Sequence, residues 1–499
     1  MSSLSPLLFL ILVPIFSALL ILIGANPRST SILGSAVNLL FLLALVVFYR
    51  PMELGYQFVS SFPVVPHLGI SFTLGADGLS LVMLFLSTVV TLAAVCVAKT
   101  PDNNPRWYYA SLLLISSGVI GAFASVDVFF FYMFHELALI PTFLLIGIWG
   151  SGDRQAAAWK ATVYLATGSF ILLLGIIGLY LIQPIGTRSF DLREMIANAQ
   201  SGLIPDAPGV YLLLLLGFGI LVSLFPFHTW APQAYACAPA PASMLHAGVL
   251  KKFGLYGLIR IVAPILPDSV QRFVPLLLVL LVCNILYVGY ITIAQRKLDW
   301  MLGYSSVMHM GYIFLGFAAL NQLSLTGASL MLLSHGLTIA VLFALCGEIR
   351  ERTGTLDFSE LGGIARICPK LGLAFGFAAM ASVGLPGFVG FAGELLVFFG
   401  GFASGEPKMG IIDGVEVFGF NFYQIATICA VWGIVISAVY MLRAYRRIFM
   451  GPLPERWSRL PDLAGFSRAA IILLIAVMLI LGFFPQILVN LATPALLVP

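Results

Sequence analysis

The chain has 499 residues, of which 60% are hydrophobic and only 9% are charged, and its formal net charge is +4. This composition excludes a soluble globular protein, and so small a net charge gives no sign of a nucleic-acid partner. The six cysteines include no CxxC pair, which argues against an iron–sulfur or zinc site and against a disulfide framework. The sequence contains neither GxGxxG nor GxxxxGK(S/T), so we expect no cofactor on this chain.

Hydropathy divides the chain into about fourteen apolar stretches, each long enough to cross a bilayer, which takes about 20 residues. The predicted spans lie near 5–24, 29–48, 79–98, 108–125, 126–149, 159–182, 209–227, 239–264, 274–295, 301–320, 326–350, 370–402, 419–449 and 467–495. The first has no basic leader and no cleavage site, so we interpret it as an uncleaved span. The sequence predicts an all-α integral membrane protein of about 14 transmembrane helices.

Basic residues are distributed unequally between the loops of this arrangement. The odd-numbered loops hold seventeen lysines and arginines, and the even-numbered loops hold six. Because cytoplasmic loops carry the excess of basic residues, we expect both termini on the outer, periplasmic side of a bacterial cytoplasmic membrane.

Two predicted spans contain helix-breaking residues. Span seven runs into 224–228 (LFPFH), and span twelve contains 384–387 (GLPG). One such break could be a kink without consequence, but two breaks five spans apart are typical of an inverted-repeat transporter, in which freed backbone lines a cavity. The predicted division is helices 1–3 in 1–107, a five-helix repeat in 108–264, an inverted copy in 274–449 and helix 14 in 467–499.

Seven ionisable or imidazole side chains interrupt the apolar stretches. They are Glu136, His246, Lys251, Lys252, His309, His335 and Glu394. A charge at the centre of a membrane helix costs at least about 2.5–3.5 kcal/mol, so such residues usually mark an ion or proton route. Each could instead be a neutral, hydrogen-bonded helix contact. A metal site is disfavoured because the histidines form no i, i+3 or i, i+4 pair.

Each residue type has a property that suits proton transfer. Glu136 and Glu394 can switch protonation in apolar surroundings. Lys252 lies about halfway along its span, too deep to reach the interface easily, and a buried lysine readily gives up its proton. Lys251 points about 100° away around the helix, so we do not expect both lysines to face one cavity. Imidazoles can relay protons. No nucleophile–base pair suggests hydrolytic catalysis.

Motifs spread over roughly residues 75–450 resemble those of the antiporter-like subunits of respiratory complex I. They are 134–141 (FHELALIP), 226–232 (PFHTWAP), 250–260 (LKKFGLYGLIR), 304–311 (YSSVMHMG), 334–336 (SHG) and 384–394 (GLPGFVGFAGE). The glutamate at 394, where other branches usually have lysine, makes the chain most similar to the chain M branch, the counterpart of mitochondrial NADH dehydrogenase subunit 4.

The resemblance implies a proton channel with two half-routes joined by a central axis of charged residues. Glu136 would be the fifth-helix acid, Lys252 the central lysine and Glu394 the terminal acid on the exit side. His309 and His335 would link the halves. The chain would belong to an NADH (or ferredoxin):quinone oxidoreductase, with quinone and electron carriers bound by neighbouring subunits and no redox centre of its own.

The chain departs from the family pattern in span seven. Leu221 stands where the family has a lysine that pairs with the fifth-helix glutamate, and Ser223 replaces a nearby proline. The segment 296–300 (RKLDW) also replaces a more uniformly basic one. We therefore expect either altered coupling or lost pumping. Two alternatives remain open: a subunit of a multisubunit Na⁺/H⁺ antiporter, and a non-pumping structural subunit of the membrane arm.

Overall fold

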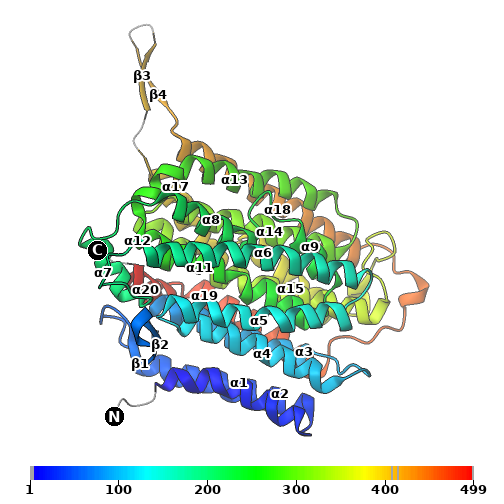
Figure 1. The fold of residues 1–499 in the computed structure, drawn as a ribbon. Coiled ribbons are helices and arrows are strands. Elements are labelled where there is room, and N and C mark those ends of the chain that lie inside the picture. The colour runs from blue at the N-terminus through cyan, green and yellow to red at the C-terminus, as the bar shows by residue number, and fades with distance from the viewer. Residues whose placement is uncertain (1–4, 406–407, 413–414, 497–499) are drawn as a thin grey trace.

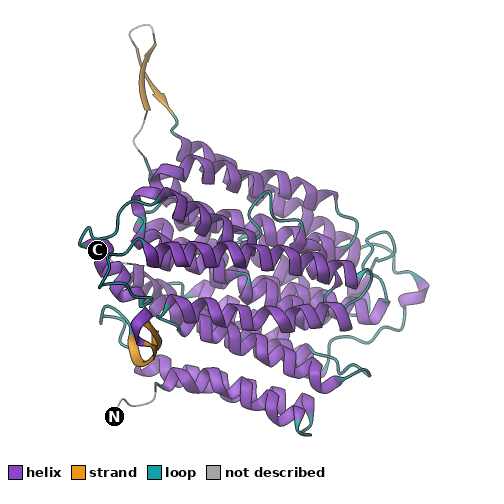
Figure 2. Cartoon of the chain, in the orientation of Figure 1, coloured by secondary structure: helices purple, strands orange, loops and turns teal. Residues whose placement is uncertain are grey.

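The computed structural model describes residues 5–405, 408–412 and 415–496, which form a bundle of helices with roughly aligned axes (Figure 1). The longer helices are α1 (Pro6–Leu22), α2 (Pro27–Phe48), α3 (Gly78–Val97), α4 (Pro105–Ala124), α5 (Val128–Trp149), α6 (Arg154–Leu181), α8 (Pro208–Val222), α13 (Pro267–Ala294), α14 (Leu298–Ala318), α15 (Gln322–Thr353), α16 (Pro369–Val383), α17 (Val389–Ala403), α18 (Phe422–Phe449), α19 (Gly465–Phe483) and α20 (Gln486–Leu496). The shorter ones are α7 (Leu192–Gln200), α9 (Trp230–Cys237), α10 (Ala240–Leu245), α11 (Lys252–Gly257) and α12 (Ala263–Ile265). Helix dominates the cartoon, as Figure 2 shows.

The composition of the helices makes the chain a multi-pass membrane protein. Within the described ranges, nine helices are long and apolar enough to cross a membrane, namely α2, α3, α4, α5, α6, α13, α15, α18 and α19. Helices α3, α4 and α15 form the centre of the bundle, with 89%, 89% and 94% of their apolar windows buried. The outer helices expose large apolar side chains, as a lipid-facing surface allows. Other predicted spans correspond to shorter or interrupted helices, such as α1, α8 and α16.

Both predicted helix breaks are present, and they are built alike. Helices α8 and α16 are each 15 residues long, and each begins with a proline. Each ends at a residue in the left-handed region, Ser223 with φ 68° and Gly384 with φ 77°. Glycine adopts this conformation freely, whereas a proline cannot, since its ring fixes φ near −65°. Serine at 223 therefore gives this break a backbone that the family's proline could not adopt.

The side chain of Asn284 on α13 holds the first break in place. Its amide donates to the carbonyls of Ser223 at 3.2 Å and Val307 at 3.1 Å, and its oxygen accepts from the Phe225 amide at 2.6 Å. Backbone groups freed by the break are thus satisfied by protein, as buried backbone requires.

Predicted span eight is not one uniform α-helix. Two π-helical turns, η2 (His246–Leu250) and η3 (Leu258–Val262), lie on either side of α11. The 3₁₀ turns η1 (Pro66–Leu68), η4 (Ile364–Arg366) and η5 (Glu455–Trp457) occupy loops. A π-turn inserts one residue into the helix and is frequent at functional sites. The turn η2 lies directly before the two lysines.

The expectation of an all-α chain was wrong in detail. Two antiparallel hairpins are present, β1 (Gln57–Val65) with β2 (Ile70–Ala76), and β3 (Lys408–Ile412) with β4 (Val415–Gly419). The second hairpin projects from the bundle beyond α17 and α18 (Figure 1). The start of α1 and the end of α20 lie at the same end of the bundle (Figure 1).

Candidate functional site

A hydrogen bond between Lys252 and His335 lies at the centre of the site. The Lys252 ammonium is fully buried, lies 2.7 Å from Nδ1 of His335 on α15, and donates to the carbonyl of Ala247 at 2.8 Å. His335 Nε2 has no hydrogen-bond partner among the described residues. The short contact can persist whichever of the two nitrogens holds the proton, so it allows a proton to move between them.

Two glycines bring the helices of this pair together. A Cβ at Gly336 would lie 2.6 Å from the carbonyl oxygen of Gly248, and a Cβ at Gly248 would lie 3.0 Å from that of Gly336. Only glycine permits so close an approach of two backbones. The contact lies one residue from His335 and four residues from Lys252, so it sets the distance between them.

His309 on α14 is held by acceptors on both of its ring nitrogens. Nδ1 lies 2.8 Å from the Ser305 carbonyl, and Nε2 lies 3.0 Å from the Ser382 carbonyl. A neutral imidazole has a single N–H, so the ring donates to both carbonyls only when it carries a second proton. The His309 and His335 ring centroids are 5.5 Å apart. The arrangement can therefore store a proton next to His335.

A small polar cavity connects the histidines to Glu394. Its lining includes His309, His335, Ser334, Thr338, Ser382 and Glu394. About 10 Å³ is open to the centre of a water molecule, which is room for about one water with several polar partners. The buried Glu394 carboxylate also lies against Gly384 at the second break, where any Cβ would collide with it. One water could thus bridge His335 to Glu394.

The two adjacent lysines are both inside the bundle, where they contact different groups. Lys251 is 1% exposed, and its Nζ lies 3.4 Å from the Ser306 carbonyl and 5.7 Å from the centroid of the Tyr235 ring. Both are buried because the helix that carries them is enclosed by other helices, including α8, α3 and α15. Neither lysine forms an ion pair with an acidic side chain of the described ranges.

His246 and Tyr235 extend the surroundings of Lys251. His246 Nδ1 lies 3.3 Å from the Tyr235 hydroxyl, and its Nε2 lacks a hydrogen-bond partner within the described part of the chain. Tyr235 therefore contacts both His246 and Lys251. Sequence reasoning missed Tyr235, whose only signal was a polar-tipped aromatic in an apolar segment.

Glu136 on α5 lies away from this cluster. The apolar residues on either side of it in the sequence predicted a buried side chain, but the side chain is partly exposed. Its side chain is 35% exposed, at the side of the bundle. The Ser169 hydroxyl donates to its carboxylate, and His135 Nδ1 lies 3.3 Å from the same oxygen. The His135 ring stacks on Phe253, the residue after Lys252, with centroids 4.1 Å apart. Glu136 thus approaches the lysines only through His135.

The α8 position that the family occupies with lysine is filled by a buried leucine. Leu221 is 3% exposed, so no charge from α8 reaches the break at this point. His228, just beyond the break, is buried, and its Nδ1 lacks a partner among the described residues.

A buried ion pair anchors the turn η3 to the start of α3. Arg260 pairs with Asp77, which caps α3, and donates to the carbonyl of Ala495 on α20 at 2.9 Å. Arg260 also donates to the Tyr56 hydroxyl, and burial raises the pKa of Tyr56 to about 12.

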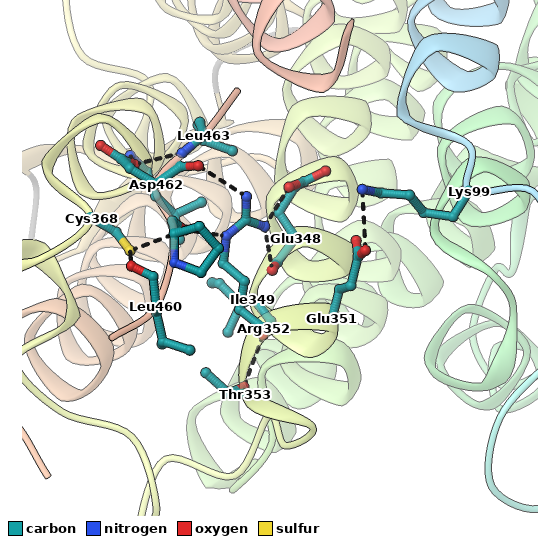
Figure 3. A network of polar contacts seen from close by, with 12 residues as sticks. Lys99, Glu348, Ile349, Glu351, Arg352, Thr353, Cys368, Leu460, Asp462 and Leu463 are labelled. Carbon is teal, nitrogen blue, oxygen red and sulfur yellow. Dashed lines mark hydrogen bonds and ion pairs between the residues drawn. The ribbon is translucent and has the colours of Figure 1, made fainter. Parts of the chain in front are cut away.

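At the opposite end of the bundle, Arg352 of α15 fastens neighbouring segments to one another (Figure 3). It pairs with Glu348, and its Nε donates to the Pro461 carbonyl at 2.7 Å. Nearby, Lys99 pairs with Glu351 at 3.1 Å. These contacts fix the end of the helix that carries His335.

A family model and curated relatives place the chain in the same family. Residues 125–420, more than half of the chain, match the family model described as NADH:quinone oxidoreductase/Mrp antiporter, TM. NAD(P)H-quinone oxidoreductase chain 4 2 of Trichodesmium erythraeum is 36% identical over 446 residues, covering 88% of this chain and 77% of that protein.

Solved structures give the same fold. A chain of respiratory complex I from Thermus thermophilus with bound NADH superposes with a TM-score of 0.86 at 26% identity, covering 99% of this chain and 100% of that one. A chain of the Mrp complex from Dietzia sp. has a TM-score of 0.81 at 22% identity, covering 99% and 96%, and that likeness carries the fold alone. The chain belongs to the family of antiporter-like membrane subunits shared by NADH:quinone oxidoreductases and Mrp antiporters.

Proposed function

We propose that this chain is a proton-translocating membrane subunit, of the chain M type, in a redox-driven NADH (or ferredoxin):quinone oxidoreductase of the bacterial cytoplasmic membrane. The observation that carries the proposal is the hydrogen-bonded Lys252–His335 pair beside a one-water cavity that ends at Glu394. Quinone and electron carriers would be bound by neighbouring subunits, and this chain would move protons outward.

The proposed route passes from Lys252 to Nδ1 of His335. Release of the Nε2 proton of His335 into the cavity then completes the transfer, because imidazole accepts on one nitrogen and donates from the other. His309 would carry a second proton transiently and donate to both of its carbonyl acceptors. Glu394 would take the proton through the cavity water and pass it toward the outer side. Glu136 would act on Lys252 from within the same five-helix repeat, through His135 and Phe253.

The matching breaks support two inverted repeats, 108–264 and 274–449, flanked by helices 1–3 in 1–107 and a last helix in 467–499. Helices α8 and α16 have the same length, the same proline start and the same left-handed end. About fourteen crossings with both termini outside would place the arginine-rich loops in the cytoplasm.

Lys251 offers an explanation for the missing lysine at position 221. Gly254 and Gly257 of α11 lie against Val222 and Phe218 of α8. Lys251 lies three residues before Gly254 and so on nearly the same side of the helix, toward the broken end of α8. A second buried cation would thus be supplied to the break by α11 in place of α8, with Tyr235 and His246 around it. The residue that supplies the cation would differ from that of the family, but proton translocation would still be coupled to quinone reduction.

The two alternatives are less well supported. The family model names the Mrp antiporter as well as the quinone oxidoreductase, but the Mrp structure is only 22% identical to this chain, whereas NAD(P)H-quinone oxidoreductase chain 4 2 of Trichodesmium erythraeum is 36% identical. A structural subunit has no use for Lys251, Lys252 and Glu394, since each buried ionisable group costs stability.

Purification of the intact assembly tests the proposal. We would tag this chain, extract it in mild detergent and identify its partners by mass spectrometry. Partners that include flavin and iron–sulfur proteins support a redox-driven complex and indicate its electron donor. Partners limited to small membrane proteins would move the assignment to a cation/proton antiporter.

A further inference from the structure

An apolar groove runs between α16 and α19, on the outside of the bundle. Its volume is about 350 Å³. The lining from α16 includes Leu373 and Phe377, and that from α19 includes Ile472, Ile475, Ala476 and Leu479. These positions recur every three or four residues, so each helix contributes one continuous face.

Each of these two faces begins with a basic residue. Lys370 is the second residue of α16, and Arg468 is the fourth residue of α19, and both line the groove. Both side chains are exposed, and neither forms an ion pair with an acidic residue of the described ranges. The groove therefore has two cations at one end and apolar walls along the rest of its length.

The nearby acid forms no ion pair with these cations, because its carboxylate accepts hydrogen bonds from backbone amides instead. Asp462 accepts from the backbone amides of Lys370 at 3.0 Å and Leu371 at 3.1 Å. It also accepts from the backbone amide of Leu463 at 2.7 Å (Figure 3). A carboxylate at this position compensates the positive end of α16. The Lys370 ammonium is left without this partner.

We propose that this groove binds an anionic phospholipid, with its headgroup at Lys370 and Arg468 and an acyl chain between α16 and α19. The face of α19 from Arg468 to Leu479 is about 16 Å long at 1.5 Å per residue, about half of a 30 Å hydrocarbon layer. The groove thus has the depth of one leaflet. Its basic end lies with the arginine-rich loops, where anionic lipids attract lysine and arginine.

A second groove on the other side of α16 gives room for another acyl chain. It has a volume of about 550 Å³ between α16 and α18, and its lining shares Leu373 and Phe377 with the first groove. The exposed Leu373 side chain lies between the two. Two chains of one lipid can therefore pass on either side of α16. Bound in this way, the lipid fastens the first half of the broken helix to α19 and α18.

Photo-crosslinking in defined bilayers tests the site. The intact assembly is placed in phosphatidylcholine vesicles that contain a photoactivatable phosphatidylglycerol, and labelled peptides are identified by mass spectrometry. We expect labelling within 373–377 and 472–479. Loss of each cation lowers occupancy about fivefold, so K370Q with R468Q lowers labelling about 25-fold. Ala476→Phe, which fills the groove and keeps both charges, removes it as well.

The matched control is Arg106→Gln, since Arg106 is likewise an exposed second residue of a helix, α4, but does not line the groove. It leaves labelling unchanged. Equal labelling by a photoactivatable phosphatidylcholine, or unchanged labelling in K370Q/R468Q, would overturn the proposal. Crosslinks from these segments to another subunit would also overturn it, since a protein would then occupy the groove.

Discussion

Replacing Gly336 by alanine tests whether the distance between Lys252 and His335 controls proton transfer. A Cβ at 336 would lie 2.6 Å from the Gly248 carbonyl oxygen, whereas ordinary contact begins at 3.4 Å. The helices must therefore separate by about 0.8 Å, which widens the 2.7 Å contact between Nζ and Nδ1 to about 3.5 Å. At that distance the hydrogen bond is lost. Alanine also favours helix more than glycine does, so a poorer helix cannot explain a loss of activity.

A graded series makes this prediction sharper. Gly248→Ala places its Cβ 3.0 Å from the Gly336 carbonyl and requires about half the displacement. Gly147→Ala, whose Cβ meets nothing closer than 3.6 Å, requires none and serves as control. We would measure protons translocated per electron in sealed vesicles during quinone reduction. We expect the largest loss in Gly336→Ala, a smaller loss in Gly248→Ala and none in Gly147→Ala. The rate of proton transfer between Lys252 and His335 in Gly336→Ala should fall by up to about 100-fold, the loss that a misplacement of about 1 Å can cause. An assembled Gly336→Ala complex with an unchanged ratio would refute the reasoning.

Three further substitutions test other parts of the account. Lys251→Leu should lower the proton-to-electron ratio, and adding Leu221→Lys should restore it. If the double variant has the same low ratio as Lys251→Leu, Lys251 does not take the place of a lysine at position 221. Gly384→Ala should displace the Glu394 carboxylate and reduce proton translocation while quinone reduction continues, so full translocation would count against the cavity route. Ser223→Gly should stabilise the assembly by about 1 kcal/mol, because it removes the strain of a left-handed serine, and the thermal midpoint of disassembly would rise. A lower midpoint would contradict this.

The sequence was sufficient to predict the features that depend on local composition. Apolar stretches located the helices, and the residues at 226 and 384–387 located both breaks. Side chains such as Lys252 and His335 stood out because hydrocarbon disfavours them. The actual contact between these two, 83 residues apart, depends on a close approach of Gly248 and Gly336 that no local pattern reveals.

Features that depend on packing could not be predicted in this way. The π-turns at 246–250 and 258–262 have no sequence signature, so the helix was expected to be uniform. Periodicity separated Lys251 from Lys252 by 100°, but an enclosed helix buries every side. The exposure of Glu136 depends on which side of the bundle α5 presents outward. The β1–β2 hairpin was not predicted because Pro63 interrupts the sequence pattern of β1.

The most direct test of the central claim is the number of protons translocated per electron in the assembled complex carrying Lys252→Ala. The account places electron transfer to quinone in other subunits, so it predicts that the ratio falls while the complex remains assembled. The conservative variant Lys252→Arg keeps the charge, but arginine cannot release its proton. The number of protons translocated per electron should therefore fall in this variant as well. A Lys252→Ala complex that translocates as many protons per electron as the wild type would contradict the account and leave this chain a structural part of the membrane arm.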